Sequence, residues 1–435
     1  MSATNGKALP PAVVLGLGQN GLATIRALAR MGVPVIGIDN DLEQPGAHTR
    51  YARKSHCPGF STEGPELADH LMRLGADLGQ KAVLFPSGDI NLTVVSENRE
   101  RLAAHFHIVL PSREVLRRIL DKKVFYRFAQ ENDLPIADTW FVNDAADIRR
   151  LAGTVRYPSL IKPYQPNAAW RRAFDTRLFI ANSAEQLVRL YDRLAAVHTD
   201  LLLQEYIPGG DGDLCWGVTY LTRDGEPVAL WTGRKLRQYP RGFGTATLAE
   251  SRWLPDVADE TLRALRALGH TGYGVVEFKR DARDGVLRIT EVTGGRTWFP
   301  HGLVTRSGLN LPYIWYCDAL GRPLPRPARV NAFDEGLRWI HEERDLKTVV
   351  LYFLGRDGFG LRQWIGSYRG RRTYAYAAWD DLGPALEAVR RVLEAGVNRV
   401  RRRISGRPRT GMRPTSSWDL ATQRANRSPE RPSDE

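Results

Sequence analysis

The sequence predicts an α/β domain followed by a region of the α+β class, and two observations lead to this prediction. Up to Pro111, short apolar runs alternate with helix-like segments, which is typical of a parallel sheet covered on both faces. From Ser112 onward strand-like segments dominate, which favours mixed sheets with helices on one side. After Pro327 the signal weakens, and a basic extension closes the chain.

Each expected element of the first region combines an apolar run with turn-forming residues at its ends. The expected strands are 12–16, 34–39, 82–85 and 107–110, and the expected helices are 22–31 and 92–103.

The second region opens with a helix that Ser112 can cap. Further helices are expected at 125–132, 183–196 and 256–268, and strands at 139–142, 159–161, 201–205, 215–221, 228–232, 274–278 and 287–291. A basic helix is expected at 382–403.

A chain of 435 residues is too long for one compact core. The expected domains are 1–112, 113–325, an extension with the basic helix at 326–404, and a disordered Arg/Pro/Ser tail at 405–435.

Composition excludes several classes of protein. The hydrophobic share of 43% is that of a globular protein, and no apolar run approaches the roughly 18 residues of a membrane-spanning helix. The N-terminus lacks the features of a secretory signal. Cys57, Cys215 and Cys317 are isolated, which argues against disulfides and thiolate metal sites. We therefore expect a cytoplasmic location.

The net charge of +13 is unevenly distributed. Residues 398–435 carry ten arginines against four acids, a surplus of +6, and the other +7 is spread over the rest of the chain. A nucleic-acid-binding protein that relies on a broad basic surface would show a different distribution, so no nucleic-acid partner is expected.

A glycine motif lies between the first strand and the first helix. It reads Gly16-Leu17-Gly18-Gln19-Asn20-Gly21, and Asp39 ends the next strand. This pattern is typical of a dinucleotide site, in which backbone amides approach a pyrophosphate and the acid binds a ribose. The alternative is a tight strand–helix turn in a Rossmann-like domain that binds no such cofactor, and the residues further along favour it.

Charged residues at the expected strand and helix ends form a second, dispersed pattern. Lys122 opens a helix, Lys162 ends a strand, and Glu277 and Glu291 lie in two strands close in sequence. Two lysines can bind a triphosphate, and two glutamates can share Mg²⁺ with it. The segment 204–209, Gln-Glu-Tyr-Ile-Pro-Gly, offers backbone groups and an apolar wall to a purine.

In this order and spacing, residues 116–320 resemble the ATP-grasp superfamily. Within this superfamily the chain most resembles the carboxylate–amine ligases of the D-aspartate ligase type. The segments that are similar to this branch are 85–89, 232–240 and 242–247. The resemblance implies a Rossmann-like pre-ATP-grasp domain, then an ATP-grasp fold of two α+β subdomains clamping ATP.

The resemblance also implies a role for each matching residue. The implied nucleotide ligands are Lys122, Lys162, Gln204, Glu205, Tyr206, Ile207 and Asp213, the metal ligands Glu277, Glu291 and Thr293, and the catalytic residues Lys162, Lys235, Arg237 and Arg296. Thr293 stands where the family usually has asparagine, so one or two Mg²⁺ ions remain open. A lid is expected near 170–175.

The expected function is therefore an ATP-dependent ligase that activates a carboxylate as an acyl phosphate and joins it to an amine. The alternatives are an NAD(P)-dependent oxidoreductase that uses the glycine motif and a non-catalytic nucleotide-binding homologue. No hydrolase, zinc-protease or P-loop motif occurs. The expected partners are small substrates and a second copy in a homodimer. The basic helix at 382–403 has two interpretations, contact with an anionic membrane and packing on the protein body.

Overall fold

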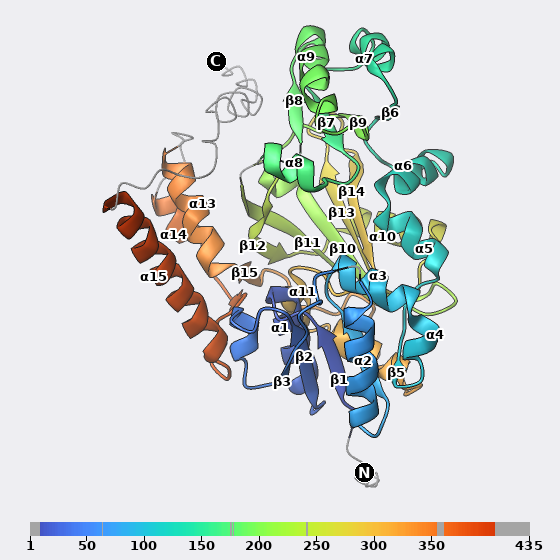
Figure 1. The fold of residues 1–435 in the computed structure, drawn as a ribbon, viewed down its shortest axis with the longest axis vertical. Helices are drawn as coiled ribbons and strands as arrows, with labels where there is room; N and C mark the ends of the chain where they lie inside the picture. Colours follow the sequence, from blue (N-terminus) through green and yellow to red (C-terminus); the bar gives the residue numbers. More distant parts are fainter. Residues whose placement is uncertain are drawn as a thin grey trace. The chain divides into compact units, whose positions relative to one another are not determined.

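The computed structural model describes residues 9–354 and 361–404, except 63, 175, 177 and 241, and the chain is coloured along its length in Figure 1. The predicted disordered tail lies outside the described residues. Contacts divide the described chain into two compact units. Unit 1 comprises 9–117, 215–277 and 292–404, and unit 2 comprises 118–214 and 278–291.

Unit 1 begins with a five-stranded sheet in the order β3-β2-β1-β4-β5, in which every pair is parallel, as predicted. Its elements are β1 (Ala12–Leu15), α1 (Gln19–Ala29), β2 (Val35–Asp39), the short 3-10 helix η1 (Pro45–His48), β3 (Arg53–His56), α2 (Glu66–Asp77), β4 (Ala82–Pro86), α3 (Asp89–Glu97), α4 (Arg99–Leu102) and β5 (Phe106–His107). Alternate residues of β1 enter two different apolar clusters, so both faces of this sheet are buried. The edge strand β3 was not predicted because its sequence, RKSH, is polar.

A seven-stranded sheet follows in the order β14-β13-β10-β11-β12-β15-β16. Its strands are β10 (Leu214–Leu221), β11 (Pro227–Tyr239), β12 (Thr245–Ser251), β13 (Gly272–Arg280), β14 (Leu287–Gly294), β15 (Arg338–Ile340) and β16 (Arg372–Tyr374). The associated helices are α10 (Pro255–Ala267), α11 (His301–Arg306), α12 (Leu311–Ala319), α13 (Glu342–Leu354), α14 (Leu361–Ser367) and α15 (Gly383–Ile404). The boundary between the units falls within β13 and β14.

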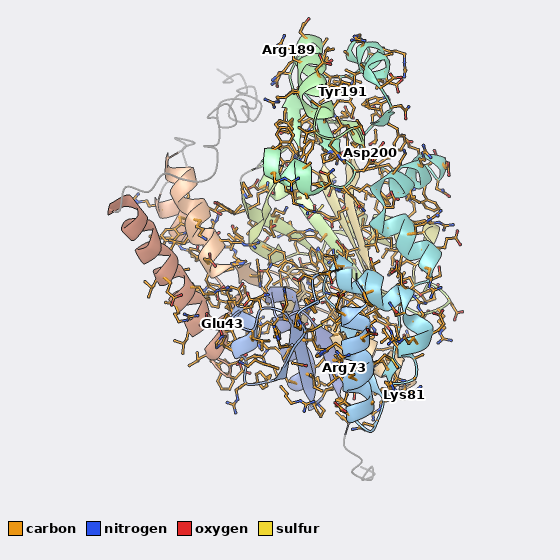
Figure 2. All side chains as sticks on the ribbon, viewed as in Figure 1. Glu43, Arg73, Lys81, Arg189, Tyr191 and Asp200 are labelled. Atoms are coloured by element: carbon orange, nitrogen blue, oxygen red, sulfur yellow. The ribbon has the colours of Figure 1, made fainter. Side chains whose placement is uncertain are left out.

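Unit 2 is built on an antiparallel four-stranded sheet in the order β6-β9-β7-β8. Its strands are β6 (Thr139–Val142), β7 (Ser159–Pro163), β8 (Phe179–Ala181) and β9 (Leu201–Glu205), and its helices are α6 (Lys122–Glu131), α7 (Ala145–Ala152), α8 (Ala168–Ala173) and α9 (Ala184–Ala195). Helix α5 (Arg113–Leu120) crosses the boundary between the units. Two residues of α9 are labelled in Figure 2: Tyr191 packs into the core, and Arg189 is exposed.

The segment predicted as a lid contributes a core residue. Trp170 lies in α8 and is buried against Phe174 and Phe179, with ring centroids 4.8 and 6.0 Å away. Its indole nitrogen donates to the carbonyl oxygen of Thr176 at 2.8 Å. Because Trp170 is part of the hydrophobic core of unit 2, it does not suit a mobile lid. Asp175 lies outside the described residues, and a lid in the neighbouring loop stays a prediction.

Cys57, Cys215 and Cys317 are all buried, and no disulfide bond joins any two of them. Among the described residues, no helix is both long and apolar enough to cross a membrane. The compact units do not follow the four predicted domains, because residues from 338 onward add β15 and β16 to the sheet that carries β10–β14.

Candidate active site

In unit 2, Lys162 lies at the centre of a small polar cluster. It sits near the end of β7, next to Leu202 of β9 in the register of the sheet. Its ammonium group donates to Gln204 Oε1 at 2.8 Å and to the Tyr126 hydroxyl at 3.4 Å. Gln204 in turn donates to Thr139 Oγ1 at 2.9 Å, which fixes the orientation of the amide. Two residues predicted separately, Lys162 and Gln204, are therefore brought together by adjacent strands.

Tyr126 shows the electrostatic character of this cluster. Burial of the phenol by itself raises the pKa of Tyr126. The opposing effects are larger in sum: the nearby Lys162 ammonium, a hydrogen bond from Gln204 and the charge of Lys122. The pKa of Tyr126 therefore lies below its ordinary value. Lys122 opens α6, whose N-cap Asp121 accepts from two backbone amides at 2.8 and 3.2 Å. The cluster thus favours negative charge, as a phosphate-binding site requires.

The predicted purine segment begins at the end of β9, within unit 2. Tyr206 and Ile207 are buried, and Lys279 places its ammonium 5.2 Å from the Tyr206 ring centroid. The carboxylate of Glu205, however, forms an ion pair with Arg283 at 2.6 Å. Its side chain therefore holds the loop after β13, and a contact with adenine is left to the backbone of this segment.

Asp213 closes the turn that follows the purine segment. Its carboxylate accepts from the backbone amide of Gly210 at 2.7 Å. Gly209 has a φ of 132°, and a Cβ there would lie 2.7 Å from Asp213 Oδ2, so this turn requires glycine. Asp211 lies in the same single turn of 3-10 helix, η2 (Asp211–Asp213). One carboxylate oxygen of Asp213 thus serves the turn itself.

In unit 1, Glu277 on β13 is held by two partners. The Trp216 indole donates to Glu277 Oε2 at 2.7 Å, and the Lys235 ammonium lies 3.9 Å from the same oxygen. Lys235 is buried and also donates to Gln238 Oε1 and to the Gly244 carbonyl oxygen, both at 3.2 Å. The structure therefore joins a predicted metal ligand and a predicted catalytic lysine.

The remaining predicted metal ligands lie two residues apart on β14. Side chains at this spacing point to the same face of a strand, so Glu291 and Thr293 share a face. Glu291 is exposed and Thr293 is buried. Carboxylate and hydroxyl oxygens of this kind are the hard ligands that Mg²⁺ takes in proteins.

Arg237 has a structural environment that the sequence did not predict. Its guanidinium pairs with both oxygens of Asp345, at 2.9 and 2.8 Å, and donates to Ser367 Oγ at 2.7 Å. Thr247 and Tyr368 also donate to Asp345, which is fully buried. Because this network ties α13 to β11 and β12, Arg237 has a structural role, and its catalytic role stays a prediction.

Arg296 follows β14 and meets the loop after β4. It donates through Nε to Asp89 and through Nη1 to the Thr297 carbonyl oxygen at 3.3 Å. Asp89 belongs to the phrase 85–89 that carries part of the resemblance. Two segments far apart in sequence thus meet in unit 1, at the end of the parallel sheet where ligands commonly bind.

The glycine motif behaves as a tight turn. A Cβ at Gly21 would lie 1.7 Å from the Gly16 carbonyl oxygen, so close packing of the turn requires glycine. Asp39 is buried, and its two oxygens accept from the backbone amides of Leu17 at 2.7 Å and Asp41 at 3.1 Å. Burial raises the pKa of Asp39 despite these bonds. The carboxylate that would bind the ribose of a dinucleotide is therefore already hydrogen-bonded to nearby backbone amides.

Unit 1 also contains a cavity of about 340 Å³ beside this motif, which the sequence did not predict. Its lining includes Gln19, Asn20, His301, Thr305 and Arg306. The first four each carry a buried side-chain nitrogen or oxygen atom with no hydrogen-bond partner among the described residues. Polar atoms left unpaired in this way are unusual, and the volume is in the range of small-molecule sites.

Two functional partners were missed at the level of sequence. Tyr126 lies one helical turn after Lys122, and this i, i+4 spacing was the signal that could have identified it. Trp216 on β10 had no such signal, because only the sheet places it against Glu277.

Comparison with known proteins identifies the fold. No family model matches the chain. The D-aspartate ligase of Enterococcus faecium (strain Aus0004) is 24% identical over 287 residues, which cover 61% of this chain and 66%, just under two thirds, of that enzyme.

Two solved structures are similar over most of the chain. Biotin carboxylase from Campylobacter jejuni, in a complex with β-γ-ATP, has a TM-score of 0.59 at 17% identity. The match covers 76% of this chain and 74% of the biotin carboxylase chain. The L-amino acid ligase from Bacillus licheniformis has a TM-score of 0.56 at 17% identity. The match covers 72% of this chain and 75% of the ligase chain. The chain therefore has the ATP-grasp fold.

Proposed function

We propose that this chain is an ATP-dependent carboxylate–amine ligase. The observation that carries the proposal is the cluster in unit 2, where Lys162, Gln204 and Lys122 converge on the buried Tyr126. The ATP-grasp fold supports it, as do a relative named for D-aspartate and a neighbour named for L-amino acids. We therefore propose that one substrate is an amino acid.

The residues fit the nucleotide and metal that this activity needs. Two ammonium groups, Lys122 and Lys162, suit a triphosphate, and the oxygens of Glu277, Glu291 and Thr293 suit one or two Mg²⁺ ions. When bound, Mg-ATP supplies the phosphoryl group that converts the substrate carboxylate into an acyl phosphate, which an amine then attacks to give an amide and phosphate.

The chain's own residues have positioning and electrostatic roles in this proposal. Lys162, oriented by Gln204, stabilises phosphate charge. Lys235 is held beside Glu277 and neutralises charge near the metal ligands. Arg296, oriented by Asp89, is placed to stabilise the charge that develops on the transferring phosphoryl group.

The oxidoreductase alternative is disfavoured by Asp39. A nicotinamide site with this glycine motif needs an acid free to bind ribose, and both oxygens of Asp39 are already used by backbone amides. A cytoplasmic location and a homodimer remain predictions.

The experiment that tests the proposal uses ligand-dependent melting. Mg-ATP should raise the melting temperature of the wild-type protein by mass action, while NAD⁺ should not. Lys162→Met keeps the apolar stem but removes the charge, so it should weaken the Mg-ATP shift and reduce phosphate release with amino-acid substrates by about 100-fold or more.

Lys123→Met is the matched control, because it removes a lysine charge from the position next to Lys122. The Lys123 ammonium lies over the ring of Tyr164, 5.5 Å from the ring centroid. It should behave like the wild type. A protein stabilised by NAD⁺ and indifferent to Mg-ATP would overturn the ligase proposal.

A further inference from the structure

The C-terminal helix α15 presents an unusual apolar surface. Leu382, Leu386, Val389 and Leu393 recur at intervals of four, three and four residues, which places them on one face. These four side chains are 58–68% exposed, and Trp379, just before them, is 87% exposed. We call the five residues the exposed stripe.

The body of unit 1 holds the opposite side of the helix. Glu387 and Ala388 are buried, and α15 packs against η1. Arg390 joins the carboxylates of Glu387 at 2.7 Å and Glu43 at 3.4 Å; Glu43 is labelled in Figure 2. The predicted packing on the protein body therefore occurs, but through a different face from the apolar one.

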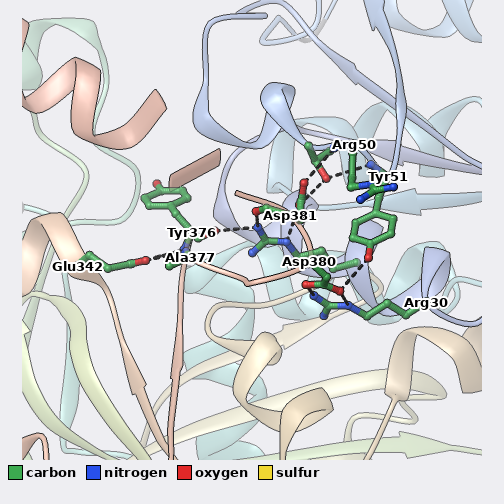
Figure 3. A network of polar contacts seen from close by, with 10 residues as sticks. Arg30, Arg50, Tyr51, Glu342, Tyr376, Ala377, Asp380 and Asp381 are labelled. Atoms are coloured by element: carbon green, nitrogen blue, oxygen red, sulfur yellow. Dashed lines mark hydrogen bonds and ion pairs between the residues drawn. The ribbon is translucent and has the colours of Figure 1, made fainter. Parts of the chain in front are cut away.

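The segment that leads into the helix is fixed, as Figure 3 shows. Asp381 is buried and accepts from Arg26 Nε at 2.9 Å, from Thr49 Oγ1 at 2.7 Å and from the Arg50 amide at 3.0 Å. Asp380 accepts from Arg30 Nε at 2.8 Å and Nη2 at 2.7 Å, and from the Tyr51 hydroxyl at 2.8 Å.

On the other side of Trp379, Glu342 accepts from the backbone amides of Tyr376 at 3.1 Å and Ala377 at 2.8 Å. Bonds on both sides thus hold the backbone around an indole that is itself exposed. This exposed position is built into the fold rather than produced by a frayed end.

The segment that carries the exposed stripe is basic in sequence. Residues 361–404 contain ten arginines and four acids, a surplus of +6. On the part of α15 whose side chains are described, Arg390 pairs with Glu43, Glu387 and Glu394, and Arg391 pairs with Asp41. The surplus of the segment therefore comes mainly from its other arginines.

We propose that the exposed stripe docks on an anionic lipid bilayer surface. A basic helix with exposed leucines on one face and an exposed tryptophan just before it is suited to lie in the interface of such a bilayer. A second copy of the chain suits this surface less well, because it would bring two sets of arginines together. The proposal goes beyond the ligase activity and does not depend on it.

The test is co-sedimentation of the full-length protein with vesicles, without ATP. The protein should sediment with vesicles containing about one third phosphatidylglycerol and remain in solution with pure phosphatidylcholine. Raising NaCl from about 0.1 M to about 0.5 M should weaken binding, since salt screens the arginines.

The variant Trp379→Ala/Leu386→Asn/Leu393→Asn should bind the anionic vesicles at least about tenfold more weakly, because it removes apolar groups from the bilayer contact. Val330→Asn is the matched control, because Val330 is an exposed apolar residue of unit 1 outside the stripe. It should bind like the wild type. Circular dichroism of each variant checks that the fold is retained.

Three results would overturn the proposal: no binding of the wild type to anionic vesicles, equal binding of the triple variant, or a stripe-dependent dimer, seen by light scattering, that ignores vesicles. The last result would assign the exposed stripe to self-association. Loss of ligase activity alone would bear only on the proposed function.

Discussion

Lys162 and Arg237 are two basic residues that lie on strands. Both were predicted to act on phosphate, but their surroundings differ. The partners of Lys162 are neutral groups, Gln204 and Tyr126, so its charge is available to an anionic ligand. Arg237 faces a buried carboxylate, Asp345, that neutralises it. At the residue scale, neutral partners fit the binding role proposed for Lys162, whereas a buried carboxylate gives Arg237 a structural role.

Glu291 gives a direct test of the metal site. Glu291→Gln removes an anionic oxygen ligand while keeping the volume of the side chain, so turnover should fall by about 100-fold or more with the fold intact. Phosphate release measured over a series of Mg²⁺ concentrations checks this.

Glu226→Gln serves as the control, because Glu226 is an exposed acid at the start of the β11 hairpin. Wild-type turnover of Glu291→Gln at limiting Mg²⁺ would remove Glu291 from the metal site.

At the scale of elements, strongly patterned segments were predicted well. The structure has α9 at Ala184–Ala195 where the sequence predicts 183–196, and β9 at Leu201–Glu205 as predicted. Elements of three residues, such as β8, β15 and β16, were not predicted, because so short a run shows no periodicity. They exist because neighbouring strands supply their hydrogen bonds.

Helix α13 depends on a single buried carboxylate. Asp345→Asn leaves Arg237 without its charged partner, so the free energy of unfolding should fall by about 3–5 kcal/mol. Urea denaturation measures this loss.

Glu343→Gln, on the same helix, is the control. Glu343 forms only an exposed pair with Lys347, and its loss should cost about 0–1 kcal/mol. Equal effects of the two substitutions would contradict a structural role for the Arg237–Asp345 pair.

For the molecule as a whole, three buried histidines of unit 1 link stability to pH. Burial is the main cause that lowers the pKa of His270, His301 and His341 to about 4 each. At a pH below the ordinary histidine pKa of about 6.5, the unfolded chain binds protons that the buried imidazoles of the native state do not bind. The free energy of unfolding should therefore fall as the pH drops from 6.5 towards 4, by up to about 1.4 kcal/mol per pH unit for each histidine.

His341→Phe should reduce this slope. The phenyl ring suits the aromatic surroundings, with Tyr376 and Trp339 at ring-centroid distances of 5.4 and 6.0 Å. Urea denaturation between about pH 4.5 and 7.5 measures the slope. His56→Gln, at an exposed position, is the control. An unchanged slope in His341→Phe would show that His341 does not contribute.

The predicted disordered tail offers a second test at this scale. Deleting residues 406–435, which lie outside the described structure, should leave turnover on a soluble substrate unchanged, because their composition lacks the apolar residues of a packed core. A large loss of activity compared with the full-length protein would mean that the tail binds a substrate or partner.

The sequence by itself determined the parallel α/β start, most strands and helices of the middle region, and the ATP-grasp fold, because periodicity and ordered polar motifs are local properties of the chain. Only the tertiary structure decided which polar residues meet. It turned Asp39 onto its own loop, paired Arg237 with Asp345, and placed Tyr126 against Lys162. It also buried one face of α15 and left the apolar face exposed. These outcomes depend on contacts between residues distant in sequence, and a local pattern such as the spacing of Lys122 and Tyr126 does not show which distant residue they meet.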